Sequence, residues 1–233
     1  MKRWLLTLLT VGVLSQLNAQ DILNIQASTG LAIPLGRIAS SNVKDSSSGY
    51  ASLGGMVEFR MGIKPFKFVG FCFSGGLGSL PTNTNSIQKK VMLQSGIDQK
   101  PSANNYRFGY ASGGVLFAYR PPVKDRWILD ASITGGYLWA EMPDIEVVQG
   151  GVIYYKSYQS YGGGWMVSAN FSFRFRVYKS LYIGSGLEYM YARPRFTNLI
   201  VEERIAGNAS TVQNTFTQNM SMIYWSGQLG VTF

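Results

Sequence analysis

Six charged residues alternate with apolar residues along four segments of the chain. The acids are Glu58, Asp130 and Glu188, and the bases are Arg60, Arg174 and Arg176. Alternate residues of a β-strand share one face, so these charges are predicted to lie opposite the apolar side chains. Because an unpaired charge is very costly away from water, acids and bases in equal number on an enclosed face are expected to form an ion-pair network. The alternative is a gate of charges that opens for small ions.

Side chains suited to catalysis are scarce. The chain contains no His and a single Cys, Cys72. A serine nucleophile without His needs another base, such as Lys, and no Ser–Lys pair shares a face of a predicted strand. Metal sites built from His or Cys are excluded by the same composition. We therefore expect no enzyme activity, no metal site and no cofactor.

The charged residues belong to segments with a period of two, which is typical of β-strands. The clearest segment covers residues 164–177, where Trp165 and Phe171 face one way while Ser168 and Arg174 face the other. Eight such strands are predicted, at residues 23–33, 50–63, 66–77, 106–120, 126–139, 164–177, 181–191 and 221–233. In the segment 106–120 the two faces compete, so its orientation stays open.

The connections between these strands alternate in length. The short ones are residues 64–65, 121–125 and 178–180, and the long ones are residues 34–49, 78–105, 140–163 and 192–219. This rhythm is typical of an antiparallel transmembrane β-barrel, which has tight turns at one rim and longer loops at the other. Residues 145–161 and 197–220 are predicted to form hairpins that extend the strands beyond the membrane. One hairpin inserted in the barrel would give ten strands, which is the alternative to eight.

The N-terminus has the pattern of an export signal. Lys2 and Arg3 precede an apolar run from Trp4 to Leu14, and Ala19 offers a small residue at a cleavage point. The run is too short to span a bilayer as a helix. We therefore predict a cleaved signal peptide at residues 1–19, followed by a single barrel domain at residues 20–233.

The composition favours a surface that faces lipid. Charged residues make up 14% of the chain and aromatic residues also 14%, whereas soluble domains contain about 25% charged residues. The net charge of +9 is scattered, with no basic helix and no run of Lys. We therefore expect attraction to anionic lipid head groups and no binding of nucleic acid.

The final strand carries the most specific pattern. Trp225, Leu229, Val231 and Phe233 share one face, and the sequence finishes on the aromatic Phe233. This pattern resembles the terminal strand of bacterial outer-membrane β-barrels, which the barrel-insertion machinery reads. Together with the export signal and the strand pattern, it makes the mature chain similar to the small eight-stranded barrels of the OmpA transmembrane domain, OmpX and OmpW group.

The resemblance implies a protein of the bacterial outer membrane. Its expected partners are the membrane lipid, the insertion machinery and other outer-membrane proteins. The peptidoglycan-binding domain of OmpA is not expected here. Barrel enzymes of the outer membrane resemble one another in using a catalytic His, and this chain contains no His, so no enzyme activity is expected. We expect a closed, side-chain-filled lumen in a structural or interaction component, or an accessory subunit of an outer-membrane assembly. The alternative is a narrow channel for ions or small apolar solutes, as OmpW-like barrels suggest.

Overall fold

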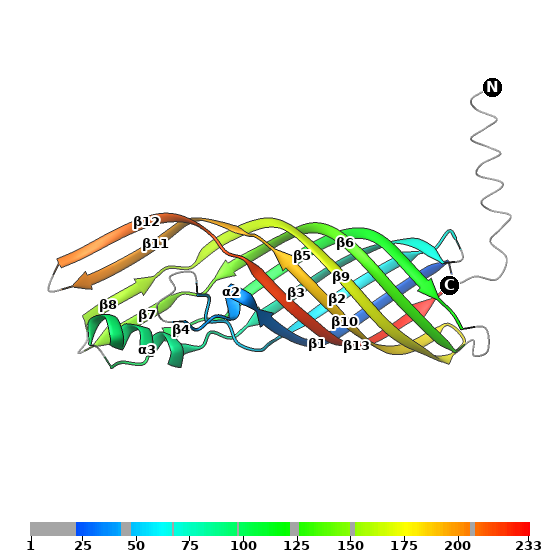
Figure 1. Cartoon of the computed structure of the whole chain (residues 1–233), viewed down its shortest axis with the longest axis horizontal. Helices are drawn as coiled ribbons and strands as arrows, with labels where there is room; N and C mark the ends of the chain where they lie inside the picture. Colours follow the sequence, from blue (N-terminus) through cyan, green and yellow to red (C-terminus); the bar gives the residue numbers. More distant parts are fainter. Residues whose placement is uncertain are drawn as a thin grey trace, which may run out of the picture.

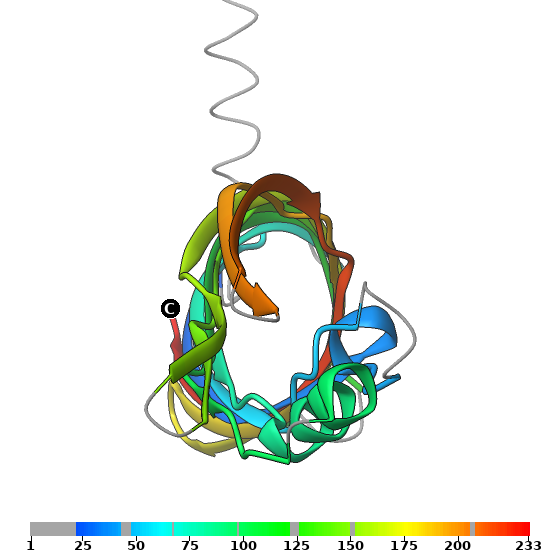
Figure 2. The same ribbon diagram turned by 90° about the vertical axis from the view of Figure 1, so that its left-hand side faces the viewer.

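The computed structural model describes residues 22–42, 48–66, 68–96, 98–121, 126–149, 152–205 and 208–233. Within these residues, eight long strands close into one antiparallel barrel (Figure 1, Figure 2). They are β1 (Leu23–Leu35), β2 (Gly54–Ile63), β3 (Val69–Leu80), β5 (Tyr106–Tyr119), β6 (Trp127–Met142), β9 (Ser160–Tyr178), β10 (Leu181–Ala192) and β13 (Met220–Thr232). Each pairs with the next in this order, and β13 pairs with β1 to complete the ring. The predicted eight-stranded, all-β barrel is confirmed, and the ten-stranded alternative is wrong.

The two rims of the barrel differ in their connections. Short connections join β2 to β3, β5 to β6 and β9 to β10 at one rim, where the Ile22 backbone N–H also donates to the Phe233 carbonyl at 2.7 Å. The long connections lie at the opposite rim (Figure 1). We call these the turn rim and the hairpin rim.

Shorter strands rise from the hairpin rim. β7 (Ile145–Gln149) pairs with β8 (Val152–Ser157), and β11 (Arg195–Ile205) pairs with β12 (Asn208–Thr217). The two predicted hairpins are therefore present. β11 also pairs with β8 and β9, and β7 pairs with β4 (Ser102–Ala103), so the hairpins join into one sheet that continues the barrel wall beyond the rim (Figure 1).

The long connections also hold two helices that the strand pattern does not predict, α2 (Gly36–Ala39) and α3 (Thr84–Ser95). The Asn83 side chain accepts a hydrogen bond from the Ser86 backbone N–H at 3.1 Å at the start of α3. Gly96 ends α3 with a left-handed φ of 71°. Both are common helix-capping signals. No helix in the described ranges is long and apolar enough to cross a membrane.

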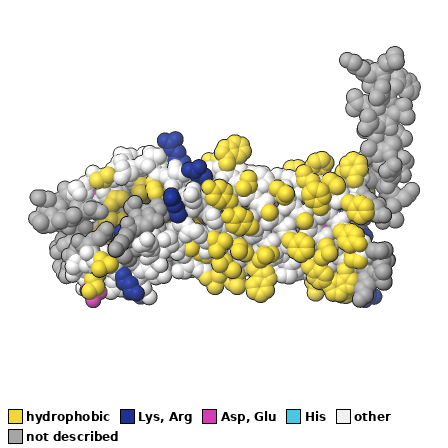
Figure 3. Space-filling view, viewed as in Figure 1, with side chains coloured by type: hydrophobic (Ala, Val, Ile, Leu, Met, Phe, Trp, Pro, Cys, Tyr) yellow, Lys and Arg dark blue, Asp and Glu magenta, His cyan; other side chains and the backbone are white. Residues whose placement is uncertain are grey.

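The outward face of the barrel is apolar. On β9, Trp165, Val167 and Phe171 point outward with 82%, 55% and 56% of their surface exposed, whereas Ser168 and Arg174 are buried. Figure 3 shows the resulting band of hydrophobic side chains, with Lys and Arg side chains at its border toward the hairpin rim. A closed barrel leaves no strand edge unpaired, and such a band around it is the surface that a bilayer covers.

Strand boundaries differ from the prediction where the ladder continues past the apolar pattern. β3 covers Val69–Leu80 rather than residues 66–77, because its pairing with β5 extends as far as Tyr106. The undecided segment is settled by the register of β5. Phe117 faces outward and Leu116 lies inside, with 47% and 3% of their surface exposed.

The barrel interior changes character between the rims. The buried charged side chains lie in the part toward the turn rim, together with hydroxyl side chains and with Leu116 and Ile128, whereas the large apolar cluster lies in the part toward the hairpin rim. The ring seen end-on in Figure 2 is therefore occupied by side chains of two kinds, stacked along the barrel axis.

Candidate functional site

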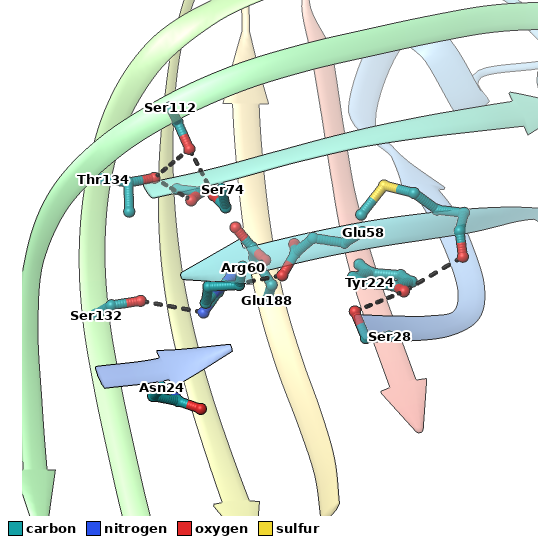
Figure 4. A network of polar contacts seen from close by, with 12 residues as sticks. Asn24, Ser28, Glu58, Arg60, Ser74, Ser112, Ser132, Thr134, Glu188 and Tyr224 are labelled. Atoms are coloured by element: carbon teal, nitrogen blue, oxygen red, sulfur yellow. Dashed lines mark hydrogen bonds and ion pairs between the residues drawn. The ribbon is translucent and has the colours of Figure 1, made fainter. Parts of the chain in front are cut away.

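Arg60 forms the centre of a charged layer that crosses the lumen (Figure 4). Its Nε lies 3.0 Å from Glu58 Oε1 on β2, and its Nη2 lies 2.7 Å from Glu188 Oε2 on β10. Its Nη1 donates to Ser132 Oγ on β6 at 3.3 Å. Two strands separate β2 from β10 in one direction around the ring, and two separate β2 from β6 in the other. A single side chain therefore links widely separated parts of the wall across the lumen.

The charged layer also holds a tyrosine. The Tyr110 hydroxyl, from β5, donates to Glu58 Oε2. The side chains of Glu58, Arg60 and Glu188 are at most 6% exposed. A buried carboxylate needs a close positive charge and further donors, and for Glu58 these are supplied by Arg60 and Tyr110.

A second ion pair lies closer to the turn rim. Arg174 on β9 contacts Asp130 on β6, and both side chains are buried. The Arg174 guanidinium carbon lies 4.4 Å from the centre of the Tyr182 ring, a cation–π distance. The Tyr182 hydroxyl in turn donates to Asn24 on β1. This lower pair thus fixes β1, β6, β9 and β10 to one another inside the barrel.

A chain of hydroxyl groups follows the inner wall from β3 to β9. Ser74 and Ser112 are 2.7 Å apart at their Oγ atoms, Thr134 Oγ1 is 3.1 Å from Ser112 Oγ, and Thr134 Oγ1 is 2.8 Å from Ser168 Oγ. Small hydroxyl residues leave space for the long Arg60 side chain beside them (Figure 4). The chain satisfies its own polar atoms without adding charge.

An apolar layer fills the lumen above these polar groups, toward the hairpin rim. It is rich in methionine, and its buried members on the strands include Met56, Met166, Met190, Met220 and Met222. Met190 of β10 and Met222 of β13 are direct cross-strand partners. Unbranched methionine side chains fill irregular gaps well, so they suit a barrel whose walls converge from several strands.

Tyr224 joins the apolar layer to the polar groups below. Its ring belongs to the apolar cluster. Its hydroxyl donates toward Ser28 Oγ at 3.3 Å and the Met56 carbonyl at 3.2 Å. Tyr224 thus ties the apolar layer to Ser28 on β1 and to the backbone of β2.

The six charged residues predicted for the lumen lie at different depths in the structure. Arg60 contacts both Glu58 and Glu188, and Arg174 contacts Asp130. Arg176 is only partly buried at the turn rim, where its backbone N–H donates to the Arg126 carbonyl at 2.8 Å. The structure therefore brings the charges together as two separate groups at different depths.

The sequence interpretation did not identify the apolar layer or its tyrosines. The signal was available, because Met56, Met166 and Met190 share the even-numbered inward face with the charged residues of their own strands. Following that face toward the hairpin rim would have predicted an apolar plug above the charges.

The residues predicted as the insertion signal lie on the outer wall. Trp225, Leu229 and Phe233 are 57%, 55% and 66% exposed, and Val231 is partly buried. Trp225 Nε1 donates to Ser185 Oγ at 3.1 Å. Their recognition by the insertion machinery stays a prediction. The predicted signal peptide lies outside the described residues.

Comparison with solved structures shows which known folds this architecture is similar to. A major outer membrane protein from Thermus thermophilus superposes with a TM-score of 0.55 at 10% identity, over 91% of this chain and 99% of that chain. The chain has the fold of a small outer-membrane β-barrel. Weaker likenesses, with TM-scores of 0.49 and 0.47, are to the protease OmpT from Escherichia coli (9% identity; 91% of this chain, 97% of that one) and OprG from Pseudomonas aeruginosa (8% identity; 90% and 95%). No protein-family model and no curated protein sequence matches the chain.

This fold and the apolar band orient the barrel in the bacterial outer membrane. In barrels of this class the tight turns face the periplasm and the longer loops face outside. The turn rim is therefore periplasmic, and the hairpin rim with its sheet of β4, β7, β8, β11 and β12 is extracellular. The charged layer and the lower pair accordingly lie below the apolar layer, on its periplasmic side.

Proposed function

We propose that the protein is a non-catalytic barrel with a closed lumen, acting as a structural or interaction component or as an accessory subunit of an outer-membrane assembly. The observation that supports this most strongly is the reach of Arg60. One guanidinium contacts Glu58, Glu188 and Ser132, so the charged layer occupies the lumen axis. An ion that passed this layer would have to separate a buried pair, which is strongly unfavourable.

Three obstacles lie in series along the proposed closed lumen. They are the methionine-rich apolar layer, the charged layer around Arg60 and the lower pair of Arg174 with Asp130. An apolar constriction excludes ions because they cannot keep their hydration there. Opening one obstacle therefore leaves two others closed.

The extracellular sheet supports an interaction role. β12 pairs only with β11 in the described sheet, and its described side chains at residues 210–215 are exposed. An exposed strand edge is a surface on which another chain can pair. Within the sheet, Lys156 Nζ on β8 lies 3.1 Å from Glu146 Oε2 on β7. This hydrogen bond holds the pKa of Lys156 above its ordinary value.

Conductance in a planar bilayer tests the closed lumen. The refolded protein is expected to show no steady current, and Arg174→Ala is expected to stay silent because the apolar and charged layers remain. A large, steady conductance in the unmodified protein would reject the closed lumen. It would favour the alternative function, a narrow channel for ions or small apolar solutes.

Co-purification in mild detergent tests the interaction role. The matched variant replaces residues 200–213 by an Asn-Gly turn, which joins the cross-strand partners Leu199 and Asn214. A stoichiometric protein partner that is retained by the unmodified protein and lost by the variant supports contact through the β11–β12 hairpin. Equal recovery from both proteins places the contact elsewhere.

A further inference from the structure

A shallow apolar groove crosses the outward wall on β13, β1, β2 and β3. Its volume is about 780 Å³. Its floor is made of small residues, among them Ala27, Gly75 and Gly227, and its sides include Phe59 and Leu229 together with Trp139 of β6. The side residues are roughly half-exposed, so the groove opens on the lipid side of the barrel.

The groove continues toward the extracellular rim. A second hollow of about 520 Å³ shares Thr29, Val57 and Leu77 with the first. It ends beside Arg107, near the first residue of β5. The combined groove therefore runs along the wall from the apolar side chains of the first hollow to Arg107.

The chain's own packing does not require the glycine at the floor of this groove. A Cβ added at Gly227 would meet no heavy atom nearer than the Thr29 carbonyl oxygen, at 3.9 Å. At the inward-facing Gly76, by contrast, a Cβ would lie 2.7 Å from the Tyr110 ring. Gly76 is small because the interior is full, whereas Gly227 leaves open space on the membrane side.

Arg107 supplies a positive charge at the upper end of the groove. Its side chain is 72% exposed, and its ion-pair partner is Glu141, with 3.9 Å between Nη1 and Oε1. The same carboxylate oxygen also accepts a hydrogen bond from Gln159. An exposed ion pair at this distance is weak, so the guanidinium keeps donors for an anionic group outside the protein.

We propose that this groove binds an outer-leaflet lipid, with an acyl chain over Gly227 and a phosphate of the head group on Arg107. The groove lies in the part of the wall that lipid covers, so the apolar groups available to fill it are lipid acyl chains. Guanidinium binds phosphate through paired hydrogen bonds, which matches the charge of Arg107 at the end of the groove. The proposal depends on the membrane-spanning fold and not on whether the lumen is closed.

Native mass spectrometry of the full barrel, with phosphorylated lipid A and its dephosphorylated counterpart as probes, tests this site. One phosphorylated lipid is expected to stay bound per barrel, and the dephosphorylated lipid is expected to bind about tenfold more weakly. Arg107→Gln should remove that preference, while Gly227→Leu should weaken both lipids by filling the groove. Heat-modifiable migration checks that each variant is folded.

Gly135→Leu is the matched control. Gly135 also faces outward, and a Cβ there would meet no heavy atom nearer than 4.0 Å, but it does not line the groove. Lipid retention by Gly135→Leu should equal that of the unmodified protein. The proposal is overturned if Gly227→Leu and Gly135→Leu retain lipid equally. It is also overturned if the unmodified barrel binds the phosphorylated and dephosphorylated lipids with equal affinity. It is also overturned if the groove instead holds a second copy of the chain, seen as a dimer that Gly227→Leu abolishes.

Discussion

Arg60 and Arg174 are both buried, and their charges contact different sets of partners. Arg60 stands between two carboxylates and also donates to a hydroxyl. Arg174 has one carboxylate, Asp130, and the face of the Tyr182 ring. Removing Arg60 therefore leaves two buried acids without their cation, whereas removing Arg174 leaves one.

Arg60→Ala is expected to destabilise the barrel by about 3–5 kcal/mol, because a charge left unpaired in a buried site is strongly unfavourable. The measurement is urea unfolding in detergent or lipid vesicles. Lys156→Ala, which breaks the partly exposed pair with Glu146 outside the barrel, is the control and should change little. Adding Glu188→Gln to Arg60→Ala should recover part of the loss. Equal stability of Arg60→Ala and the unmodified protein would contradict the role given to the charged layer.

Strand β6 shows how the narrow barrel limits side-chain size on one face only. Gly135 and Gly136 are consecutive and point to opposite faces. A Cβ at Gly135 would be in open space, whereas a Cβ at Gly136 would lie 2.6 Å from the Ser112 Cα on β5. The inward residue must be glycine because the neighbouring strand curves into the space that a side chain would use.

This pair of glycines gives a prediction with an internal control. Gly136→Ala should destabilise the barrel by about 1–3 kcal/mol, the usual range for overpacking. Gly135→Ala should be neutral or stabilise it by roughly 0.5–1 kcal/mol, because alanine restricts the unfolded chain more than glycine does. Thermal loss of the compact, unboiled form on a gel ranks the two variants. A reversed order would show that the faces of β6 are assigned wrongly.

At the scale of the whole molecule, closure of the ring explains both the stability and the location. The pairing of β1 with β13 satisfies the backbone groups that would otherwise form two edges. A closed ladder with an apolar outer band is stable in lipid and is unstable as a soluble monomer. The charged layer, the lower pair and the chain of hydroxyl groups lie inside the barrel, away from the lipid.

The mature protein should fractionate with outer membranes and migrate faster on a gel before boiling than after. The reason is that a closed barrel keeps its hydrogen-bonded ladder in detergent until it is heated. Fractionation combined with boiled and unboiled samples provides the measurement. Recovery of folded protein in the soluble periplasmic fraction would contradict the membrane placement.

The sequence by itself determined which residues share a face. Glu58 and Arg60 lie inside while Phe59 lies outside, because the period of two is a local property of the extended backbone. The same local rule predicted eight strands, short turns at one rim and two hairpins at the other. It did not predict α3, although Asn83 and Gly96 are ordinary capping residues, because the strand pattern on both sides dominated the interpretation of that connection.

Only the tertiary structure decided which residues meet. Arg60 and Glu188 are 128 positions apart, and their contact depends on the closure of the ring and the register of every ladder between them. The division of the charges into two groups, the methionine-rich layer above them and the position of Gly227 beside Thr29 have the same origin. Alternation assigns a side chain to a face, but its depth and its neighbours across the barrel depend on strand tilt and register, which are set by all eight strands together.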